Sequence, residues 1–228
     1  MSLAFLTVAT GRYLAYAQAN LLSLWRHRPN AEITVWTDHP GAGGGDGLLG
    51  CHWPHLGWPW ATLLRYEAYL THPGLNGSHA ADYLYAMDAD LLWTRDPWPD
   101  LCEHSLVFAT HPGFAGAHAK AAPFAQAGLC RLPEGVETPY LAGGFWGGRS
   151  ERFLGVCEAV RDLIRREAAS ERVPKWHDET ALNRVAVDQP DRHVLPWGWL
   201  APDAACDWYL GDRAQACVLA VTKPKEAR

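Results

Sequence analysis

A buried-strand pattern that ends in two acidic residues places the strongest constraint on what this chain can fold into. The apolar run Tyr83–Met87 is followed directly by Asp88 and, one residue later, by Asp90, and the chain becomes apolar again at Leu91–Trp93. In α/β sheets, ligands bind just beyond the carboxyl ends of the strands. We therefore expect both carboxylates to face one polar site there. Paired carboxylate oxygens suit a hard cation such as Mn²⁺ or Mg²⁺, which takes its remaining ligands from phosphates.

Strand patterns and helix patterns alternate along the rest of the chain. Short apolar runs predict strands at 3–10, 33–37, 83–87 and 105–110, around Val194 and at 217–221. Apolar residues at helical spacing predict helices at 13–25, 62–71, 153–166 and 177–187, with Ser150 as a candidate cap of the third. The alternation indicates an α/β fold with a mostly parallel central sheet flanked by helices. With 228 residues and neither a repeat nor a linker, residues 1–228 are expected to form one domain.

The composition argues against several classes of partner. The net charge is −5 and the two signs are interspersed, so we expect no nucleic-acid partner. The apolar stretch 1–10 is too short to span a bilayer and follows no basic region, so we expect no integral membrane segment. Six cysteines are scattered without paired spacing, which favours free thiols in a reducing compartment. These features predict a cytoplasmic protein.

Tryptophan is used unusually often, with 12 residues, many of them beside Pro or Gly. One interpretation is that these large side chains pin loops. The other is that they stack on sugars, because an indole ring offers a flat apolar surface with one polar group.

Several local stretches occur in an order typical of one enzyme family: Val8–Tyr13, 61–67, Asp88–Asp90, His111–Phe114, Tyr140–Gly148, Trp176–Asn183 and Ala220–Lys223. On these stretches the chain resembles glycosyltransferase family 6, the retaining α-1,3-transferases that include the blood-group A and B enzymes. The resemblance covers nearly the whole chain. It implies a nucleotide-sugar transferase fold of the GT-A type, a UDP-sugar donor and an oligosaccharide or glycolipid acceptor.

The resemblance also bears on localisation and on metal dependence. Mammalian relatives carry an N-terminal anchor and stem that are missing here, so we expect a bacterial or phage-type member, peripheral to the membrane where acceptor glycans are built. Many bacterial relatives replace the acidic triplet by Asn-x-Asn and work without metal. Retention of both Asp88 and Asp90 instead implies dependence on Mn²⁺ or Mg²⁺.

Roles for individual residues follow from the same resemblance. Glu179 would be catalytic, as a nucleophile or as the stabiliser of an oxocarbenium-like transition state. The implied donor contacts are Val8, Thr10, Tyr13, Arg65, Asp88, Ala142, Gly143, Gly144, Asp178 and Lys223. The implied acceptor contacts are His111, Trp176, His177, Glu179 and Asp203. The last of these fits loosely, because Leu195–Asp203 departs from the family pattern. Plainer interpretations stay open, since Asp178 and Glu179 also favour a helix N-terminus.

The expected activity is therefore the transfer of GalNAc or Gal from a UDP-sugar to a galactose-containing acceptor in an α-1,3 linkage. In this family the tripeptide Ala142-Gly143-Gly144 lies against the C2 substituent of the donor sugar, and its small side chains favour UDP-N-acetylgalactosamine. One alternative is a UDP-galactose-specific α-1,3-galactosyltransferase, and another is a transferase that mainly hydrolyses the UDP-sugar. From a different class, the chain could be a non-catalytic sugar-binding module that uses its tryptophan-rich loops.

Overall fold

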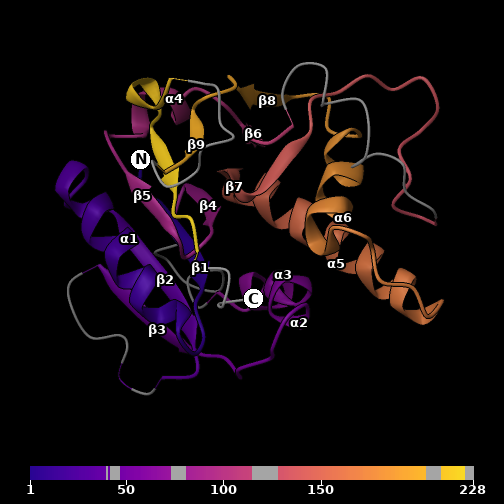
Figure 1. Ribbon diagram of the computed structural model, residues 1–228, viewed down its shortest axis with the longest axis horizontal. Coiled ribbons are helices and arrows are strands. Elements are labelled where there is room, and N and C mark those ends of the chain that lie inside the picture. The colour runs from indigo at the N-terminus through magenta and orange to yellow at the C-terminus, as the bar shows by residue number, and fades with distance from the viewer. Residues whose placement is uncertain (40, 42–46, 73–80, 115–127, 204–211, 224–228) are drawn as a thin grey trace.

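The main sheet contains seven strands in the order β3-β2-β1-β4-β7-β6-β8 (Figure 1). The computed structural model describes residues 1–39, 41, 47–72, 81–114, 128–203 and 212–223. The strands of this sheet are β1 (Leu3–Val8), β2 (Glu32–Thr37), β3 (Leu48–His52), β4 (Tyr83–Met87), β6 (Leu106–Thr110), β7 (Leu141–Arg149) and β8 (Arg192–Leu195). Strand β7 runs antiparallel to β4 and β6, and every other pairing is parallel. The predicted α/β fold with a mostly parallel sheet is confirmed.

Helices cover both faces of this sheet. Helix α1 (Tyr13–His27) lies on one face, and α5 (Ser150–Ala169) and α6 (His177–Ala186) lie on the other (Figure 1). Buried side chains accordingly form two large clusters, one with Leu21 of α1 and one with Phe153 of α5. Successive side chains of a strand point to opposite faces, so Phe5 of β1 belongs to the first cluster and Leu6 to the second.

A smaller sheet with the order β5-β10-β9 packs beside α1. Its strands are β5 (Leu91–Trp93), β9 (Leu200–Pro202) and β10 (Val218–Ala220). Strand β10 runs antiparallel to β5, and the backbone N–H of Val221 then donates to the carbonyl of Asp90 at 2.8 Å. This sheet therefore carries the end of the described chain to the turn that follows β4.

Some predicted elements differ from those observed. The helix predicted at 62–71 is divided into α2 (Trp60–Leu63) and α3 (Arg65–Tyr69), because the backbone leaves helical values at Leu64. Ser150 does not cap α5. It is the first residue of that helix, and its hydroxyl donates to the carbonyl of Ala81. Strands β3, β5, β7 and β9 were not predicted. Strand β3 is a largely exposed edge strand, β5 and β9 have only three residues each, and β7 is rich in glycine. Two further short elements are α4 (Trp98–Leu101) and the 3₁₀ helix η3 (Arg213–Gln215).

The structure bears in part on two expectations from the sequence, the absence of a membrane-spanning segment and the free cysteines. Within the described ranges, no helix combines the length and the apolar character needed to cross a bilayer. Five of the cysteines are free thiols in the structure, and Cys206 lies outside the described residues.

Candidate active site

The acidic turn, Asp88–Asp90, lies where β4 ends and β7 begins. Strand β4 ends at Met87, which is opposite Phe145 in the antiparallel register with β7. Gly143 and Gly144 therefore lie beyond the end of β4, and the backbone N–H of Asp88 donates to the carbonyl of Gly144 at 2.8 Å. The chain thus places a carboxylate and a side-chain-free stretch of β7 next to each other at the carboxyl end of a buried strand.

Arg65 joins three elements at this place. It is the first residue of α3, and only 7% of its surface is exposed. One guanidinium nitrogen donates to Asp88 Oδ1 at 2.6 Å, and the other donates to the Gly143 carbonyl at 3.0 Å and to the Asp178 carboxylate. A buried charge is costly unless it is paired and hydrogen-bonded. These three contacts meet that condition, so the guanidinium fixes the acidic turn, β7 and α6 relative to one another.

These groups surround a pocket of about 170 Å³. Its lining consists of Thr62, Arg65, Asp88, Gly143, Gly144, Trp176, His177, Asp178 and Glu179. Of these, Thr62 is the residue to which sequence analysis gave no role. Ala142, expected at the donor sugar, is instead buried in the apolar cluster on the α1 side of the sheet. Gly143 and Gly144, which follow Ala142 in the chain, are the residues of this tripeptide that line the pocket.

The glycines are required by close neighbours. A Cβ at Gly143 would lie 2.8 Å from a guanidinium nitrogen of Arg65, and a Cβ at Gly144 would lie 3.0 Å from Asp88 Oδ2. A side chain at either position would therefore press on the charged groups of the pocket.

Glu179 lies in the first turn of α6 and points toward β7. Its Oε2 accepts a hydrogen bond from the Gly143 backbone N–H at 2.7 Å. Burial raises the pKa of Glu179 to about 7, against the opposing effects of the Gly143 amide and the Tyr140 hydroxyl. One turn further along α6, Asn183 bonds both the N–H and the carbonyl of Leu141, each at 2.8 Å. This pair of bonds holds α6 in register with β7 and so fixes the position of the Glu179 backbone.

Asp178 is the buried partner of Arg65. Burial raises the pKa of Asp178 to about 6, and the adjacent Arg65 charge opposes this rise. The pairing with Arg65 keeps Asp178 in its charged form. Asp178 thus forms an ion pair with Arg65, whereas its neighbour Glu179 lies beside the open pocket without an ionic partner among the described residues.

Aromatic side chains form the rim of the pocket. Trp176 precedes α6 and is partly exposed, and the ring of His177 lies 4.4 Å from that of Trp58, measured between centroids. Trp58 is 75% exposed. His177 has a φ of +53°, in the left-handed region that non-glycine residues seldom adopt. Such conformations concentrate at functional sites, where the surrounding structure enforces them.

Asp90 faces a cation from the other end of the chain. Its Oδ2 lies 2.7 Å from Lys223 Nζ, which is also 4.8 Å from the centroid of the Tyr13 ring. Burial and then the charge of Asp88 raise the pKa of Asp90, while Lys223 opposes this rise. The structure therefore brings together Tyr13, Asp90 and Lys223, three residues that are far apart in the sequence.

Asp203 contacts the segment next to Lys223. Its carboxylate accepts from the backbone N–H of Thr222 at 2.9 Å and from the Thr222 hydroxyl at 2.6 Å. These two contacts anchor the chain one residue before Lys223.

The remaining predicted residues, Val8, Thr10 and His111, are not among those that line the pocket. Val8 is the last residue of β1 and Thr10 follows the strand, with its hydroxyl 3.0 Å from Nδ1 of His55. His111 packs its ring 5.7 Å from Tyr140, and burial lowers the pKa of His111 to about 4, so this ring is neutral at pH 7.

Asp38 is a polar residue at this edge that sequence analysis missed. Its carboxylate accepts from the Gly11 backbone N–H at 2.8 Å, and this bond is the main cause of its lowered pKa. It follows the buried strand β2 in the same way that Asp88 follows β4. The strand-end pattern that identified Asp88 could therefore have identified Asp38 as well.

The acidic turn has the donor set expected of a site that shares its metal with a ligand. Among the described residues, no group of three His, Cys, Asp or Glu side chains could hold a metal ion. Asp88 and Asp90 offer hard carboxylate oxygens on one turn. In the described part of the chain, Oδ2 of Asp88 and Oδ1 of Asp90 accept no hydrogen bond from another residue. Two carboxylates with free oxygens suit Mg²⁺ or Mn²⁺, which take further ligands from phosphates and water.

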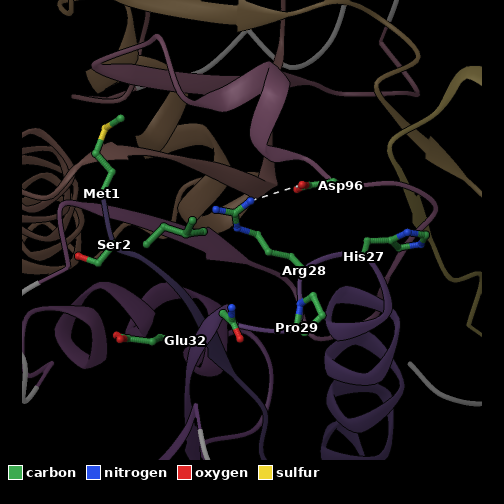
Figure 2. Close-up of a pocket in the computed structure, with 9 residues that line it drawn as sticks. Met1, Ser2, His27, Arg28, Pro29, Glu32 and Asp96 are labelled. Carbon is green, nitrogen blue, oxygen red and sulfur yellow. Dashed lines mark hydrogen bonds and ion pairs between the residues drawn. The ribbon is translucent and has the colours of Figure 1, made fainter.

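A larger cavity, of about 420 Å³, lies at the opposite end of the main sheet (Figure 2). It is lined by the first residues of β1 and β2 and by the residues that follow α1. Arg28 projects into it and approaches Asp96 at 3.4 Å. Both of these side chains are partly exposed, so solvent screens the pair.

Comparison with protein-family models places the pocket within a known family. A family model described as Glycosyltransferase family 6 matches residues 58–209. The matched segment includes Arg65, Asp88, Gly143, Asp178 and Glu179, which meet at the pocket. A search of curated proteins finds no match.

Proposed function

The chain belongs to glycosyltransferase family 6, and on this premise we propose that it moves GalNAc, or Gal, from a UDP-sugar to a galactose-containing acceptor. The linkage formed would be α-1,3, with retention of the anomeric configuration. The observation that carries the proposal is the charge arrangement in the pocket, where Arg65 bonds Asp88 and Asp178 beside Glu179. A sugar-binding module needs no such set of charges linked through a buried arginine, so this arrangement favours the enzyme over the non-catalytic alternative.

Asp88 and Asp90 would hold the donor through a divalent cation. When bound, Mn²⁺ or Mg²⁺ supplies a Lewis acid that offsets the negative charge developing on the leaving diphosphate. Lys223 would add a further positive charge, since its ammonium lies beside Asp90. Val8, Thr10 and Tyr13 would line the side of the site that receives the uridine, which is the usual place for nucleotides in such folds.

Transfer itself breaks one bond and forms another. The bond between the anomeric carbon and the β-phosphate oxygen breaks, and its electron pair leaves with UDP. The acceptor hydroxyl oxygen bonds to the anomeric carbon, and its proton passes to the leaving phosphate oxygen or to solvent. Positive charge develops at the anomeric carbon meanwhile, and a carboxylate there stabilises it or attacks the carbon from the opposite face. Glu179 is the residue for this role, because the Gly143 N–H fixes its carboxylate at the pocket.

The acceptor would lie at the aromatic rim. Trp176 and Trp58 are exposed beside His177, and indole faces stack on sugars. His111 is a further acceptor contact, in its neutral form. For Asp203, we propose that it anchors the segment before Lys223, because its carboxylate is bonded to Thr222.

The preferred donor would be UDP-N-acetylgalactosamine. The argument rests on Gly143 and Gly144, which line the pocket without side chains. An acetamido group is larger than a hydroxyl group and needs the room that glycine leaves.

The experiment is a matrix of UDP-sugars and galactose-terminated acceptors, run with Mn²⁺ and with EDTA, in which product linkage and free sugar are both measured. We expect an α-1,3-linked GalNAc product that forms only with the metal. Release of free sugar without product would support the hydrolytic alternative. Binding of acceptor glycans without turnover of any donor would contradict the proposal.

A further inference from the structure

A buried amide contacts the acidic turn from the side opposite the pocket. Asn20 lies on α1 with none of its surface exposed, and it is surrounded by apolar residues of the cluster that α1 shares with the sheets. Burying an amide in such surroundings is costly unless its groups are hydrogen-bonded. A leucine would fill this position without that cost. The presence of an amide here therefore calls for an explanation in terms of the hydrogen bonds that it makes.

Both ends of the Asn20 amide are engaged. Nδ2 donates to the backbone carbonyl of Asp88 at 2.9 Å and approaches the sulfur of Met87 at 3.6 Å. Oδ1 accepts from the indole N–H of Trp93 at 2.8 Å. An indole nitrogen can only donate. Trp93 therefore fixes which end of the amide is oxygen and directs the amide N–H group toward Asp88.

Trp93 is itself immobilised. Its backbone N–H donates to Ser23 Oγ at 3.0 Å, and the Ser23 hydroxyl donates to the Asn20 carbonyl at 2.7 Å. Its ring makes edge contacts with Phe5 and Phe145, at centroid distances of 5.5 and 5.6 Å. The amide of Asn20 is thus held by a side chain that is packed into the rigid core.

The backbone of the turn is consequently held from three directions. The N–H of Asp88 bonds to Gly144 of β7, the carbonyl of Asp88 bonds to Asn20 of α1, and the carbonyl of Asp90 bonds to Val221 after β10. Of these three, the bond to α1 is the one made by a side chain, so it can be removed without changing the sheet.

We propose that Asn20, oriented by Trp93, is a positioning residue that holds the turn so that both aspartates present their carboxylates to one cation. This inference rests on the proposed function, since it assigns Asn20 to the metal and diphosphate part of that site. Groups that orient the ligands of a metal are commonly worth about 10- to 100-fold in metal affinity or activity.

The first test compares Asn20→Leu with the wild type by titrating UDP into the whole protein, with Mn²⁺ and with EDTA. We expect the affinity for UDP with Mn²⁺ to fall by about tenfold, and the affinity in EDTA to stay the same. The matched control is Thr34→Val, which removes another buried hydrogen bond, that between Thr34 and His72. Equal losses in the two variants would show that Asn20 acts only through general stability and would overturn the inference.

The second test separates Asn20 from Trp93. Trp93→Phe removes the bond that orients the amide, so it should lower the same affinity by a smaller factor. Residues that act through one contact show non-additive effects. The double variant should therefore bind no more weakly than Asn20→Leu alone, and fully multiplied losses would count against the coupling.

Amide hydrogen exchange measures the turn without any ligand. Asn20→Leu should speed exchange in peptides that cover residues 86–93 and leave β2 unchanged, and unchanged exchange in 86–93 would overturn the inference. This measurement stands even if the wild type binds UDP equally well in EDTA. That outcome would refute metal dependence, whereas the exchange rates would still decide whether Asn20 holds the turn.

Discussion

The two ends of the main sheet differ in what they do with charge. At the carboxyl end of β4, a pocket of about 170 Å³ is lined by Arg65, Asp88 and Asp178. Arg65 and Asp178 are buried, Asp88 is partly exposed, and both carboxylates bond directly to the guanidinium. At the other end, a cavity of about 420 Å³ holds the partly exposed pair of Arg28 and Asp96 (Figure 2). The larger hollow thus has the weaker electrostatic interactions.

The difference shows where chemistry can be supported. Charges in a screened, solvated cavity interact weakly, because water competes with each contact. In the smaller pocket, each charged group is fixed by a neighbour on a different element. Such preorganised charges can act on a developing charge without first rearranging, which is the main requirement of electrostatic catalysis. The smaller pocket is therefore the better candidate for the active site, although the other cavity is larger.

Replacing one arginine at each end of the main sheet should give the largest contrast in stability and in activity. Arg65→Met leaves the buried carboxylate of Asp178 without its partner, a change that typically costs about 3–5 kcal/mol of stability. Arg28→Met should cost about 0–1 kcal/mol, as for other exposed pairs. Urea unfolding of both variants measures the free energies of unfolding. Transfer activity should be lost in Arg65→Met and kept in Arg28→Met.

Arg65→Lys sharpens the same comparison. Lysine keeps the charge but lacks the planar fork that reaches two carboxylates and a carbonyl. We expect a folded protein with reduced activity. Equal stability of Arg65→Met and Arg28→Met would erase the contrast between the two ends.

Replacing the carboxylate of Glu179 should have the next largest effect. Glu179→Gln keeps the shape of the side chain but removes its negative charge. The hydrogen bond from the Gly143 amide is retained in a weaker form. We expect kcat to fall by about a hundredfold, comparable to the loss of other electrostatic groups. UDP affinity, measured by calorimetry, should change little. Transfer at near wild-type rates would show that another group faces the anomeric carbon.

The pH dependence of the wild type should reflect the same carboxylate. The pKa of Glu179 is raised to about 7, so the charged form needed for catalysis grows as the pH rises. For a single group of this pKa, about a tenth is ionised at pH 6 and about nine tenths at pH 8, so kcat/KM should rise by about tenfold between them. A flat profile over this range would argue against a role for ionised Glu179.

The smallest predicted effect concerns donor choice. In Gly144→Ala, the new methyl group would press on the Asp88 carboxylate, which should slow both donors through the shared diphosphate. Overfilling a packed site costs about 1–3 kcal/mol. Only the difference between donors reports on the C2 substituent. We expect an additional loss of about fivefold for UDP-N-acetylgalactosamine relative to UDP-galactose, near the lower end of that range.

Measuring kcat/KM for both donors decides this point. A wild-type preference for UDP-galactose would contradict the donor assignment. An unchanged donor ratio in the variant would show that Gly144 serves the turn rather than the sugar.

Local sequence patterns predicted the strands and helices that are determined by neighbouring residues in the chain. The alternation of apolar runs gave β2, β4 and β6, and the strand-end position of Asp88 located the polar edge of the sheet. Helical spacing located α6, so Glu179 could be placed in a first turn. Patterns of this kind fail at β3, because an edge strand that buries little has no apolar face to detect.

Long-range pairings could not be predicted from the same patterns. Arg65 and Asp178 are 113 positions apart, and nothing in the spacing of either residue announces the other. Asn20 interrupts the apolar face of α1, where a polar residue would ordinarily mark the solvent side. Its partners come from a turn and a strand about 70 positions later, and only the fold reveals them.

Whether Asp88 and Asp90 bind the donor through a metal is tested most directly by titrating UDP into the protein with Mn²⁺ and with EDTA, and by repeating the titration with the double variant Asp88→Asn/Asp90→Asn. We predict that Mn²⁺ strengthens UDP binding by the wild type and not by the variant, that sugar transfer by the variant is abolished, and that its unfolding temperature changes little. Equal UDP affinity in Mn²⁺ and EDTA for the wild type, together with full turnover in excess EDTA, would contradict it.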